Sequence, residues 1–313
     1  MFETPEVFAT FANHEEWGLR IMTDPECDLS QVLSILLGES LPRLIAIMDG
    51  TVEKPFLHEI VSSQLDVDRL DYLLRDQLCT GADVGGFDHE RLLRSLSVSE
   101  DGHLVVGLDS VGAVEAYLVT RWHMYQLVYF HKLNMLTQAY YVRALKRARE
   151  LHENGDLPLS LKMRDMLSNR ELTPLRYAGL TDSFVIADVF QWAGHDDPVL
   201  SNCARRLSSR DDFHKRIRLE LTKEQAESLL GPLREVVSAA GFDGKEDVIH
   251  TPLQKEGYLP YEAGIHLDDG RDIMEASKMI ESISGEFSRS MLFVPRAVRE
   301  ECEELAKGLL GSN

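Results

Sequence analysis

The sequence predicts a mainly α-helical chain. Residues 62–76 gather polar side chains on one arc and leucines on the other when read at about 100° per residue, as an amphipathic helix does. Residues 111–152 contain few helix breakers. Two-residue alternation of apolar side chains, which is typical of strands, is confined to residues 94–110 and to short stretches after residue 216. We therefore expect a helical core with one β-hairpin and a small C-terminal α+β lobe.

Composition limits the partners of this chain. With 313 residues, of which 44% are hydrophobic, the chain is long enough to bury a core of its own. The formal net charge of −19 disfavours binding to nucleic acid or to an anionic membrane, because a phosphate-rich surface repels it. An anionic substrate then requires a local basic pocket.

Cysteine usage and the N-terminus indicate a cytoplasmic protein. The four cysteines are widely spaced and form no CxxC pair, which argues against a zinc ribbon or a disulfide framework. The N-terminus has no basic region followed by an apolar stretch. No apolar run approaches the roughly 20 residues of a membrane span. We expect reduced thiols and no membrane partner.

The first part of the chain predicts short helices separated by breakers. Residues 1–22 read as the end of one helix and the start of another, with Asn13 as the N-cap and His14 directly after it. On its position alone, His14 is a solvated first-turn residue. Further helices are predicted at 29–37, 41–48 and 55–61, with Gly38 and Asp49-Gly50 between them.

The central stretch, residues 62–76, allows two interpretations. In the simpler one its charges are solvated and paired, as Arg75 can be with Asp71 at i,i+4. However, Asp68, Tyr72 and Asp76 repeat every four residues and so point the same way. An aspartate for a metal, an arginine for phosphate and a tyrosine for a ring or sugar suit a nucleotide phosphate site.

The motif itself carries a family resemblance. The sequence SSQLDVDRLDYLLRD at 62–76, followed by Thr80-Gly81 and by GFDHERLL at 86–93, resembles the second half of the HD domain in HD-superfamily phosphohydrolases. It is most similar to the deoxynucleoside triphosphate triphosphohydrolases related to the vertebrate SAM-and-HD-domain enzyme. The similarity continues through residues 120–132 and, more loosely, to the C-terminus. It implies an HD-domain-like helical core, of which residues 1–152 form the C-terminal part, and a helical then α+β lobe over 153–313.

The remaining elements follow in order. Residues 81–86 are a glycine-rich loop without the Gly-Lys-Ser/Thr of a Walker phosphate loop. Residues 94–110 predict a hairpin turning at Asp101-Gly102, and 111–152 a long helix. Asn154-Gly155-Asp156 marks a boundary, after which 159–216 is helical. Beyond it, strands are predicted at 217–221, 247–250, 259–267 and 291–294, and helices at 224–240, 277–283 and 296–310.

Polar residues in the long helix support the resemblance. Four polar or aromatic residues recur at three- and four-residue steps and so share one face: Arg121, Tyr125, Tyr129 and Lys132. The aromatic ones could simply be core residues. The family pattern instead implies a wall of a nucleotide pocket. The only His-Asp dipeptide, His195-Asp196, precedes Pro198 in a turn before a helix, and we expect no metal there.

The resemblance implies roles for eight residues. A divalent metal (Mn, Mg, Fe or Zn) is held in part by an aspartate, a histidine assists proton transfer, basic residues neutralise the triphosphate, and a phenol–carboxylate set holds the sugar. Cleavage then releases nucleoside and tripolyphosphate. The resemblance assigns Asp68 to the metal and His14 to proton transfer. It places Arg69, Arg121 and Lys132 near the phosphates, and Tyr72, Asp76 and Tyr129 near the sugar.

The family's metal site is incomplete in this sequence. It uses a histidine, a His-Asp doublet and a later aspartate, and only the last, Asp68, is present; the others belong upstream of His14. One carboxylate does not hold a transition metal tightly. The chain is then a truncated product, half of a split enzyme, or a metal-free homologue acting as a nucleotide-binding or oligomerisation partner. A helical scaffold without a nucleotide site is a further reading. We also expect a homo-oligomer.

Overall fold

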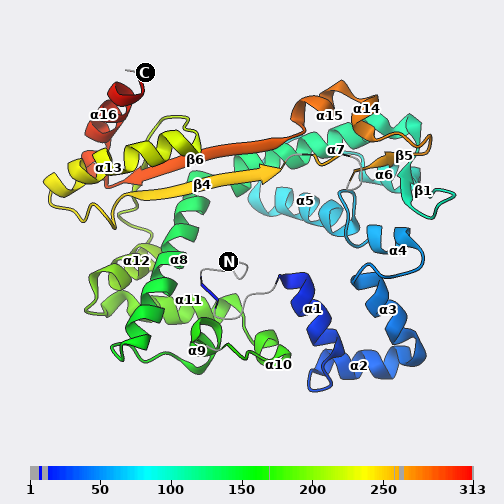
Figure 1. Ribbon diagram of the computed structural model, residues 1–313, viewed down its shortest axis with the longest axis horizontal. Coiled ribbons are helices and arrows are strands. Elements are labelled where there is room, and N and C mark those ends of the chain that lie inside the picture. The colour runs from blue at the N-terminus through cyan, green and yellow to red at the C-terminus, as the bar shows by residue number, and fades with distance from the viewer. Residues whose placement is uncertain (1–6, 9–12, 169, 257, 261–263, 312–313) are drawn as a thin grey trace. The chain divides into compact units, whose positions relative to one another are not determined.

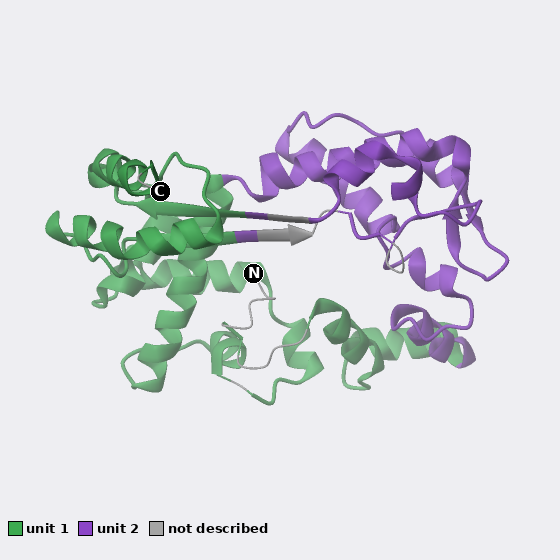
Figure 2. Cartoon of the chain, turned by 45° about the horizontal axis from the view of Figure 1, so that its top comes forward, with its two compact units in different colours: residues 1–38, 132–252, 289–313 green, residues 39–131, 253–288 purple. Residues whose placement is uncertain are grey.

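The computed structural model describes residues 7–8, 13–168, 170–256, 258–260 and 264–311. These residues form two compact units, each discontinuous in sequence (Figure 2). Unit 1 contains residues 1–38, 132–252 and 289–313, and unit 2 contains residues 39–131 and 253–288. The division predicted at residue 152 falls at the end of a helix of unit 1 and stays a prediction.

Unit 2 is a set of short helices around a buried α7 (Figure 1). Its core is formed mainly by Leu73, Leu92, Val114, Tyr117 and Met124, all fully buried. The helices are α3 (Leu41–Met48), α4 (Pro55–Glu59), α5 (Val67–Thr80), α6 (His89–Ser95), α7 (Val111–Met124), the π-helix η3 (Tyr125–Tyr129), α14 (Ile273–Ala276) and α15 (Lys278–Ile283).

A three-stranded sheet closes one side of unit 2. The strands are β1 (Leu96–Val98), β2 (Leu104–Val106) and β5 (His266–Leu267), in the order β1-β2-β5. β1 and β2 are antiparallel, as the predicted hairpin requires, whereas β2 and β5 are parallel. Gly102 has a φ of +85°, which glycine adopts without strain, so the Asp-Gly turn is confirmed.

Local signals set both ends of α5. The Asp66 side chain accepts a hydrogen bond from the backbone N of Arg69 at 2.7 Å, which makes Asp66 the N-cap. The helix therefore starts at Val67, and residues 62–65 are a turn, which corrects the expectation that the whole motif is helical. Gly81 ends α5 in the left-handed region, with a φ of +67°.

Unit 1 contains the longest helix and most of the second sheet, of which residues 253–256 and 286–288 are counted in unit 2. Asn13 caps α1 (His14–Thr23) as predicted, and Trp17 of α1 stacks on Tyr177 with ring centroids 4.2 Å apart. The sheet has the order β3-β6-β4. The other elements are α2 (Asp28–Leu37), α8 (Lys132–Glu153), α9 (Leu161–Ser168), α10 (Pro174–Ala178), α11 (Asp182–Gln191), α12 (Pro198–Ser209), β3 (Lys215–Arg216), α13 (Lys223–Ala239), β4 (Ile249–Glu256), β6 (Glu286–Val294) and α16 (Arg299–Gly311).

The mainly α-helical class is confirmed, with three local corrections. The long helix expected over 111–152 is interrupted, because α7 passes into a π-helix and residues 130–131 are not helical before α8 begins. The strand expected at 217–221 lies earlier, at Lys215–Arg216, and continues only as an isolated bridge at Leu221. The strand expected at 259–267 is reduced to β5, and residues 261–263 lie outside the described part.

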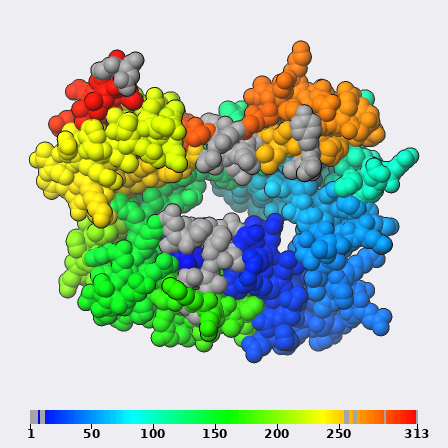
Figure 3. All heavy atoms as spheres, in the orientation of Figure 1, coloured from blue at the N-terminus to red at the C-terminus, as the bar shows by residue number. Residues whose placement is uncertain are grey.

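The expectation that no apolar run approaches the length of a membrane span is wrong for residues Asp28–Met48. This 21-residue stretch has a mean hydropathy of 1.4, so by length and composition it could span a membrane. The interruption Gly38-Glu39-Ser40 breaks the stretch in the sequence and concealed its length. None of its most apolar 18-residue window is buried, and α2 lies on the surface (Figure 3, dark blue). We define the apolar face of α2 as its exposed side chains Leu29, Val32, Ile35 and Leu36.

Candidate functional site

A π-helix brings together aromatic residues at the end of α7. The backbone N of Phe130 donates to the carbonyl of Tyr125 at 2.8 Å, a bond across five residues. Such wide turns are rare and are frequently found at functional sites. Within the turn the rings of Tyr125 and Tyr129 meet edge to face, with centroids 5.0 Å apart.

The π-helix is tied to α5 by a short hydrogen bond. The hydroxyl of Tyr129 donates to Oδ2 of Asp76 at 2.6 Å. Burial, followed by this bond to Asp76, raises the pKa of Tyr129 well above its usual value, so the phenol stays protonated. Oδ1 of Asp76 is not used in that bond and can accept a further hydrogen bond from a ligand hydroxyl.

Tyr72 lies beside this pair and also keeps its proton. Burial is the largest cause that raises the pKa of Tyr72 to about 12, and the nearby phenol of Tyr125, through its charge and a hydrogen bond, adds to it. The positive charges of Arg121 and Arg69 act in the opposite direction. At neutral pH the hydroxyl of Tyr72 therefore stays protonated, in an electropositive environment.

Arg121 is a buried cation for which the described residues provide no counter-charge. Its side chain extends from α7, only 8% of the residue is exposed, and its guanidinium lies 6.0 Å from the centroid of the Tyr125 ring. In the part of the chain that the structure describes, no carboxylate forms an ion pair with Arg121. A buried charge is costly unless it is paired, so this position favours an anionic ligand.

Arg69 is held differently from Arg121. Its guanidinium forms an ion pair with Asp66, the residue that caps α5. Asp66 also accepts from the backbone N of Ser63 at 3.0 Å, and the buried hydroxyl of Tyr117 donates to the carbonyl of Gln64 at 2.7 Å. These three contacts hold the turn before α5 in place and orient Arg69.

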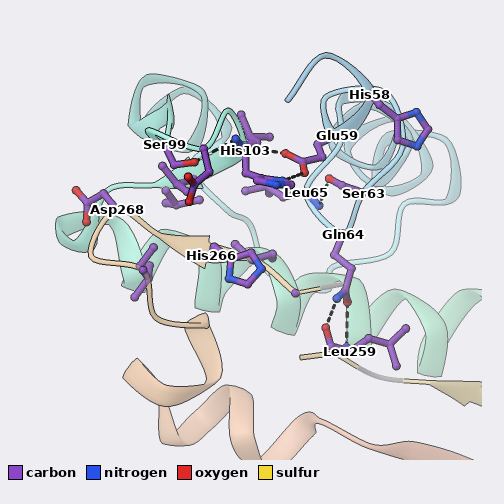
Figure 4. Close-up of a pocket in the computed structure, with 18 of the residues that line it drawn as sticks. His58, Glu59, Ser63, Gln64, Leu65, Ser99, His103, Leu259, His266 and Asp268 are labelled. Carbon is purple, nitrogen blue, oxygen red and sulfur yellow. Dashed lines mark hydrogen bonds and ion pairs between the residues drawn. The ribbon is translucent and has the colours of Figure 1, made fainter. Parts of the chain in front are cut away.

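Arg69 also borders a cavity of about 990 Å³ in unit 2, which is large enough for a nucleotide. Figure 4 shows Glu59 pointing toward His103, and Nδ1 of His103 forms a hydrogen bond with Oε1 of Glu59 at 2.6 Å. It also shows Gln64, whose side chain accepts a hydrogen bond from the backbone N of Leu259. His266 and Asp268 line the β5 side. The lining is mixed apolar and polar, and Arg69 is its only arginine among the described residues.

Comparisons with known proteins agree with this architecture. A family model described as "HD associated region" matches residues 87–173, which include Arg121 and the π-helix. A solved phosphohydrolase from Bacteroides thetaiotaomicron is 26% identical with a TM-score of 0.74, and the match covers 93% of this chain and 74% of that one. These two matches support an HD-superfamily fold. A hypothetical protein from Aquifex aeolicus shares the fold at 23% identity, with a TM-score of 0.64 and coverage of 94% and 75%.

Curated relatives of this HD-fold chain are uncharacterized and longer. The uncharacterized protein YwfO of Bacillus subtilis is 27% identical over 286 residues, covering 87% of this chain and 65% of YwfO. The uncharacterized protein MJ1154 of Methanocaldococcus jannaschii is 30% identical over 131 residues, or 41% of this chain and 28% of MJ1154. The chain therefore spans less than two thirds of the length of both relatives.

The HD-fold chain does not present a complete metal site in its described part. Asp68 is exposed on the first turn of α5. No group of three or more His, Cys, Asp or Glu side chains that could hold a metal ion occurs among the described residues. The residues present therefore do not fit a tightly held divalent metal. His195 lies just before α12, where its Nδ1 accepts from the backbone N of Asp197, the N-cap of that helix.

The two remaining predicted residues belong to unit 1. His14 is exposed as the first residue of α1, and Lys132 is exposed at the start of α8. Of the eight predicted residues, the structure gathers Tyr72, Asp76, Arg121 and Tyr129 into one network, with Arg69 close enough to affect Tyr72. Sequence reasoning did not assign Tyr125, Tyr117 or Asp66 to the site. The four-residue spacing of Tyr117, Arg121 and Tyr125, and the N-cap position of Asp66, were the available signals.

Proposed function

We propose that this chain carries the substrate-binding part of an HD-type phosphohydrolase, and that its substrate is a deoxynucleoside triphosphate. The observation that carries the proposal is Arg121, a buried guanidinium with no carboxylate partner in the described part of the chain. A phosphate is the ligand that best satisfies a guanidinium, because two N–H groups can bind two oxygens at once.

The neighbours of Arg121 suit the rest of a nucleotide. Arg121 neutralises phosphate charge, and the protonated hydroxyl of Tyr72 donates to a phosphate or sugar oxygen. Asp76, oriented by Tyr129, accepts from a sugar hydroxyl through its second oxygen. The deoxy preference is proposed from the family resemblance.

Two proposed roles depend on residues outside this network. His14 is proposed to assist proton transfer and Asp68 to supply one metal ligand, in keeping with the family resemblance. Because Asp68 alone does not hold a metal, the remaining ligands must come from elsewhere in the active protein. We therefore propose that the active protein depends on a divalent metal.

A second function is favoured by the same exposed Asp68. Without a three-donor cluster in the described part of the chain, the molecule would bind nucleotide without hydrolysing it, as a regulatory or oligomerisation partner. The two functions share the ligand and differ in turnover. A scaffold that binds no nucleotide is the remaining alternative.

The test separates binding from turnover. Binding of deoxynucleoside triphosphates is measured by calorimetry, and release of nucleoside and tripolyphosphate is measured with manganese or magnesium. We expect Arg121→Gln to weaken binding at least about tenfold, as loss of a charge-assisted contact implies. Arg94→Gln, an exposed change of the same charge in the same unit, should leave binding unchanged.

Each outcome selects one function. Turnover that Asp68→Ala abolishes supports the enzyme. Binding without turnover supports the non-hydrolysing partner. Absence of binding in a folded wild-type chain, or equal binding by the Arg121→Gln and Arg94→Gln variants, contradicts the nucleotide site.

A further inference from the structure

A narrow groove of about 740 Å³ lies within unit 1, and none of the residues proposed to bind nucleotide lines it. One wall is α8 from Met135 to Glu150. The facing wall is formed mainly by residues 245–252, which lead into β4. The 15 helical steps from Met135 to Glu150 rise about 22 Å, which sets the length of the groove.

The groove is too slender for a helical partner. Its volume of about 740 Å³, divided by a length of about 22 Å, gives a mean cross-section of about 34 Å². An α-helix with its side chains is about 10–12 Å wide, or about 80–110 Å² in cross-section. The groove therefore fits an extended chain.

Both walls of the groove have an apolar part and a charged part. Along α8 the lining changes from mostly apolar side chains to charged ones after Val142. The charged parts of the two walls are joined by an ion pair between Arg143 and Glu246. The apolar side chains that α8 and β4 contribute to the lining are Met135, Ala139, Val142, Ile249 and Pro252.

The charged part of the groove is positive, although the chain has a net charge of −19. Five basic and two acidic side chains line it, an excess of three positive charges: Arg143, Lys146, Arg147, Arg234 and Lys245 against Glu150 and Glu246. Arg147 is paired with Glu150 and with Asp197, each at 2.7 Å. Arg234 and Lys245 are exposed, and no carboxylate of the described chain forms an ion pair with either. An anionic ligand would supply their counter-charge.

We propose that this groove binds a linear alkyl carboxylate, with the carboxylate among the basic side chains and the hydrocarbon chain along the apolar part. A hydrocarbon chain is slender, and its burial requires no hydrogen bonds. An extended acidic peptide fits less well. β4 is the end strand of its sheet, but Pro252 within it has no N–H and would interrupt an added ladder. The proposal does not depend on the function assigned to unit 2.

The test uses sodium octanoate and isothermal titration calorimetry on the full chain. Butanoate keeps the carboxylate and shortens the chain, whereas 1-octanol keeps the chain and lacks the charge. We expect one octanoate per chain. Each buried methylene is worth about fourfold in affinity, so butanoate should bind at least about tenfold more weakly. Octanol should also bind at least about tenfold more weakly, because it makes no charge-assisted contact.

Two groove variants are compared with matched controls. Ala139→Phe fills the apolar part and should weaken octanoate binding at least about tenfold, whereas Ala240→Phe, at the exposed C-cap of α13, should not. Arg234→Gln/Lys245→Gln should weaken binding about three- to tenfold, as expected for two exposed charge contacts. Arg164→Gln/Lys307→Gln removes the same two charges from exposed helix positions elsewhere in unit 1 and should bind as wild type does. Circular dichroism melting checks that each variant folds.

Several results would overturn the proposal. One is a wild-type chain that does not bind octanoate, and another is butanoate or octanol binding as tightly as octanoate. Equal binding by the charge variant and its control would do the same, and this comparison remains decisive if Ala139→Phe does not fold. Arg121→Gln should leave octanoate binding unchanged, and a loss there would place the ligand in unit 2 instead. Hexaglutamate that displaces octanoate would assign the groove to an acidic peptide.

Discussion

The hydroxyl of Tyr129 donates a 2.6 Å hydrogen bond to Oδ2 of Asp76, which joins the π-helix to α5. Tyr129→Phe removes this donor and leaves a half-buried carboxylate oxygen without it. We expect the free energy of unfolding to fall by about 1.5–3 kcal/mol, the usual range for a hydrogen bond to a charged group. Urea denaturation followed by circular dichroism measures the loss.

Tyr141→Phe is the matched control for Tyr129→Phe. Tyr141 is a buried tyrosine of α8 whose pKa is raised mainly by burial, with no hydrogen bond contributing. We expect its replacement to change the free energy of unfolding by less than about 0.5 kcal/mol. Equal losses in the two variants would show that the Tyr129–Asp76 bond adds nothing beyond the packing of the ring.

Arg121→Met should separate stability from ligand binding. Because the guanidinium is buried without a carboxylate partner in the described chain, its removal relieves a desolvation cost, and we expect the unliganded protein to keep or gain stability. By contrast, Arg143→Met breaks a half-buried ion pair with Glu246 and should destabilise the protein by about 1–3 kcal/mol. A loss of that size for Arg121→Met would indicate a structural role for Arg121.

Two glycine-to-alanine replacements should change the free energy of unfolding in opposite directions. Gly81 caps α5 with a φ of +67°, and a methyl group added there would meet open space, so Gly81→Ala is opposed by backbone strain alone. We expect a loss of about 1–2 kcal/mol. Gly18 lies inside α1 with similar space, and Gly18→Ala should gain about 0.5–1 kcal/mol in melting experiments. A stabilising Gly81→Ala would contradict the cap geometry.

His214 should make stability depend on pH. Burial lowers the pKa of His214 below its ordinary value of 6.5, and the nearby Arg206 and Arg143 also lower it, while Asp247 at 3.0 Å from its Nε2 acts against them. The unfolded chain therefore takes up a proton at a higher pH than the folded one, so stability falls as pH drops through about 6.5. Denaturation at pH 8 to 5 measures this slope.

His214→Gln removes the titrating group and should flatten the slope, even if the absolute stability also falls. The ring signal of His214 followed by NMR gives a second measurement that does not depend on the variant. A ring that titrates at or above pH 6.5 in the folded protein would contradict the prediction.

The apolar face of α2 provides a test of self-association. Its side chains reach 83% exposure at Ile35 and 73% at Leu36, which is unfavourable in water. We expect the chain to sediment above its monomer mass at micromolar concentration, and Ile35→Ser/Leu36→Ser to reduce that mass. A wild-type monomer, or wild-type binding to lipid vesicles that the double variant loses, would count against a second copy as the occupant.

Most elements could be predicted from local sequence signals, because caps and turns depend on interactions between residues that are close in sequence. Asn13 and Gly102 were identified correctly from a cap preference and a turn preference, which depend on near neighbours alone. The start of α5 was placed too early, because periodicity does not reveal that Asp66 uses its side chain as a cap. β5 pairs with a strand far away in sequence, which no local pattern specifies.

The candidate site was predictable in part for the same reason. Tyr72 and Asp76 were selected from a four-residue spacing on one helix, and Arg121 and Tyr129 through the family pattern. Lys132 was placed on one face with Arg121 and Tyr129 on the assumption of one unbroken α-helix. Because the helix is interrupted after Tyr129, the periodicity no longer predicts where Lys132 points. The pairing of Tyr72 with Tyr125 required two helices to be placed side by side, which spacing within either one does not encode.

The wide turn at Tyr125–Tyr129 accommodates one additional residue of chain at this point. A π-helical turn holds one more residue than an α-helical turn, so removing Gln126 would let the segment close into a regular α-helix. Five residues of a π-turn and four residues of an α-turn each cover about one full turn, so the residues on either side would keep their directions. Tyr129 lies at the end of the turn, and its hydroxyl would stay near Asp76. The turn is therefore a point at which the length of the chain can change by one residue without separating Tyr129 from Asp76.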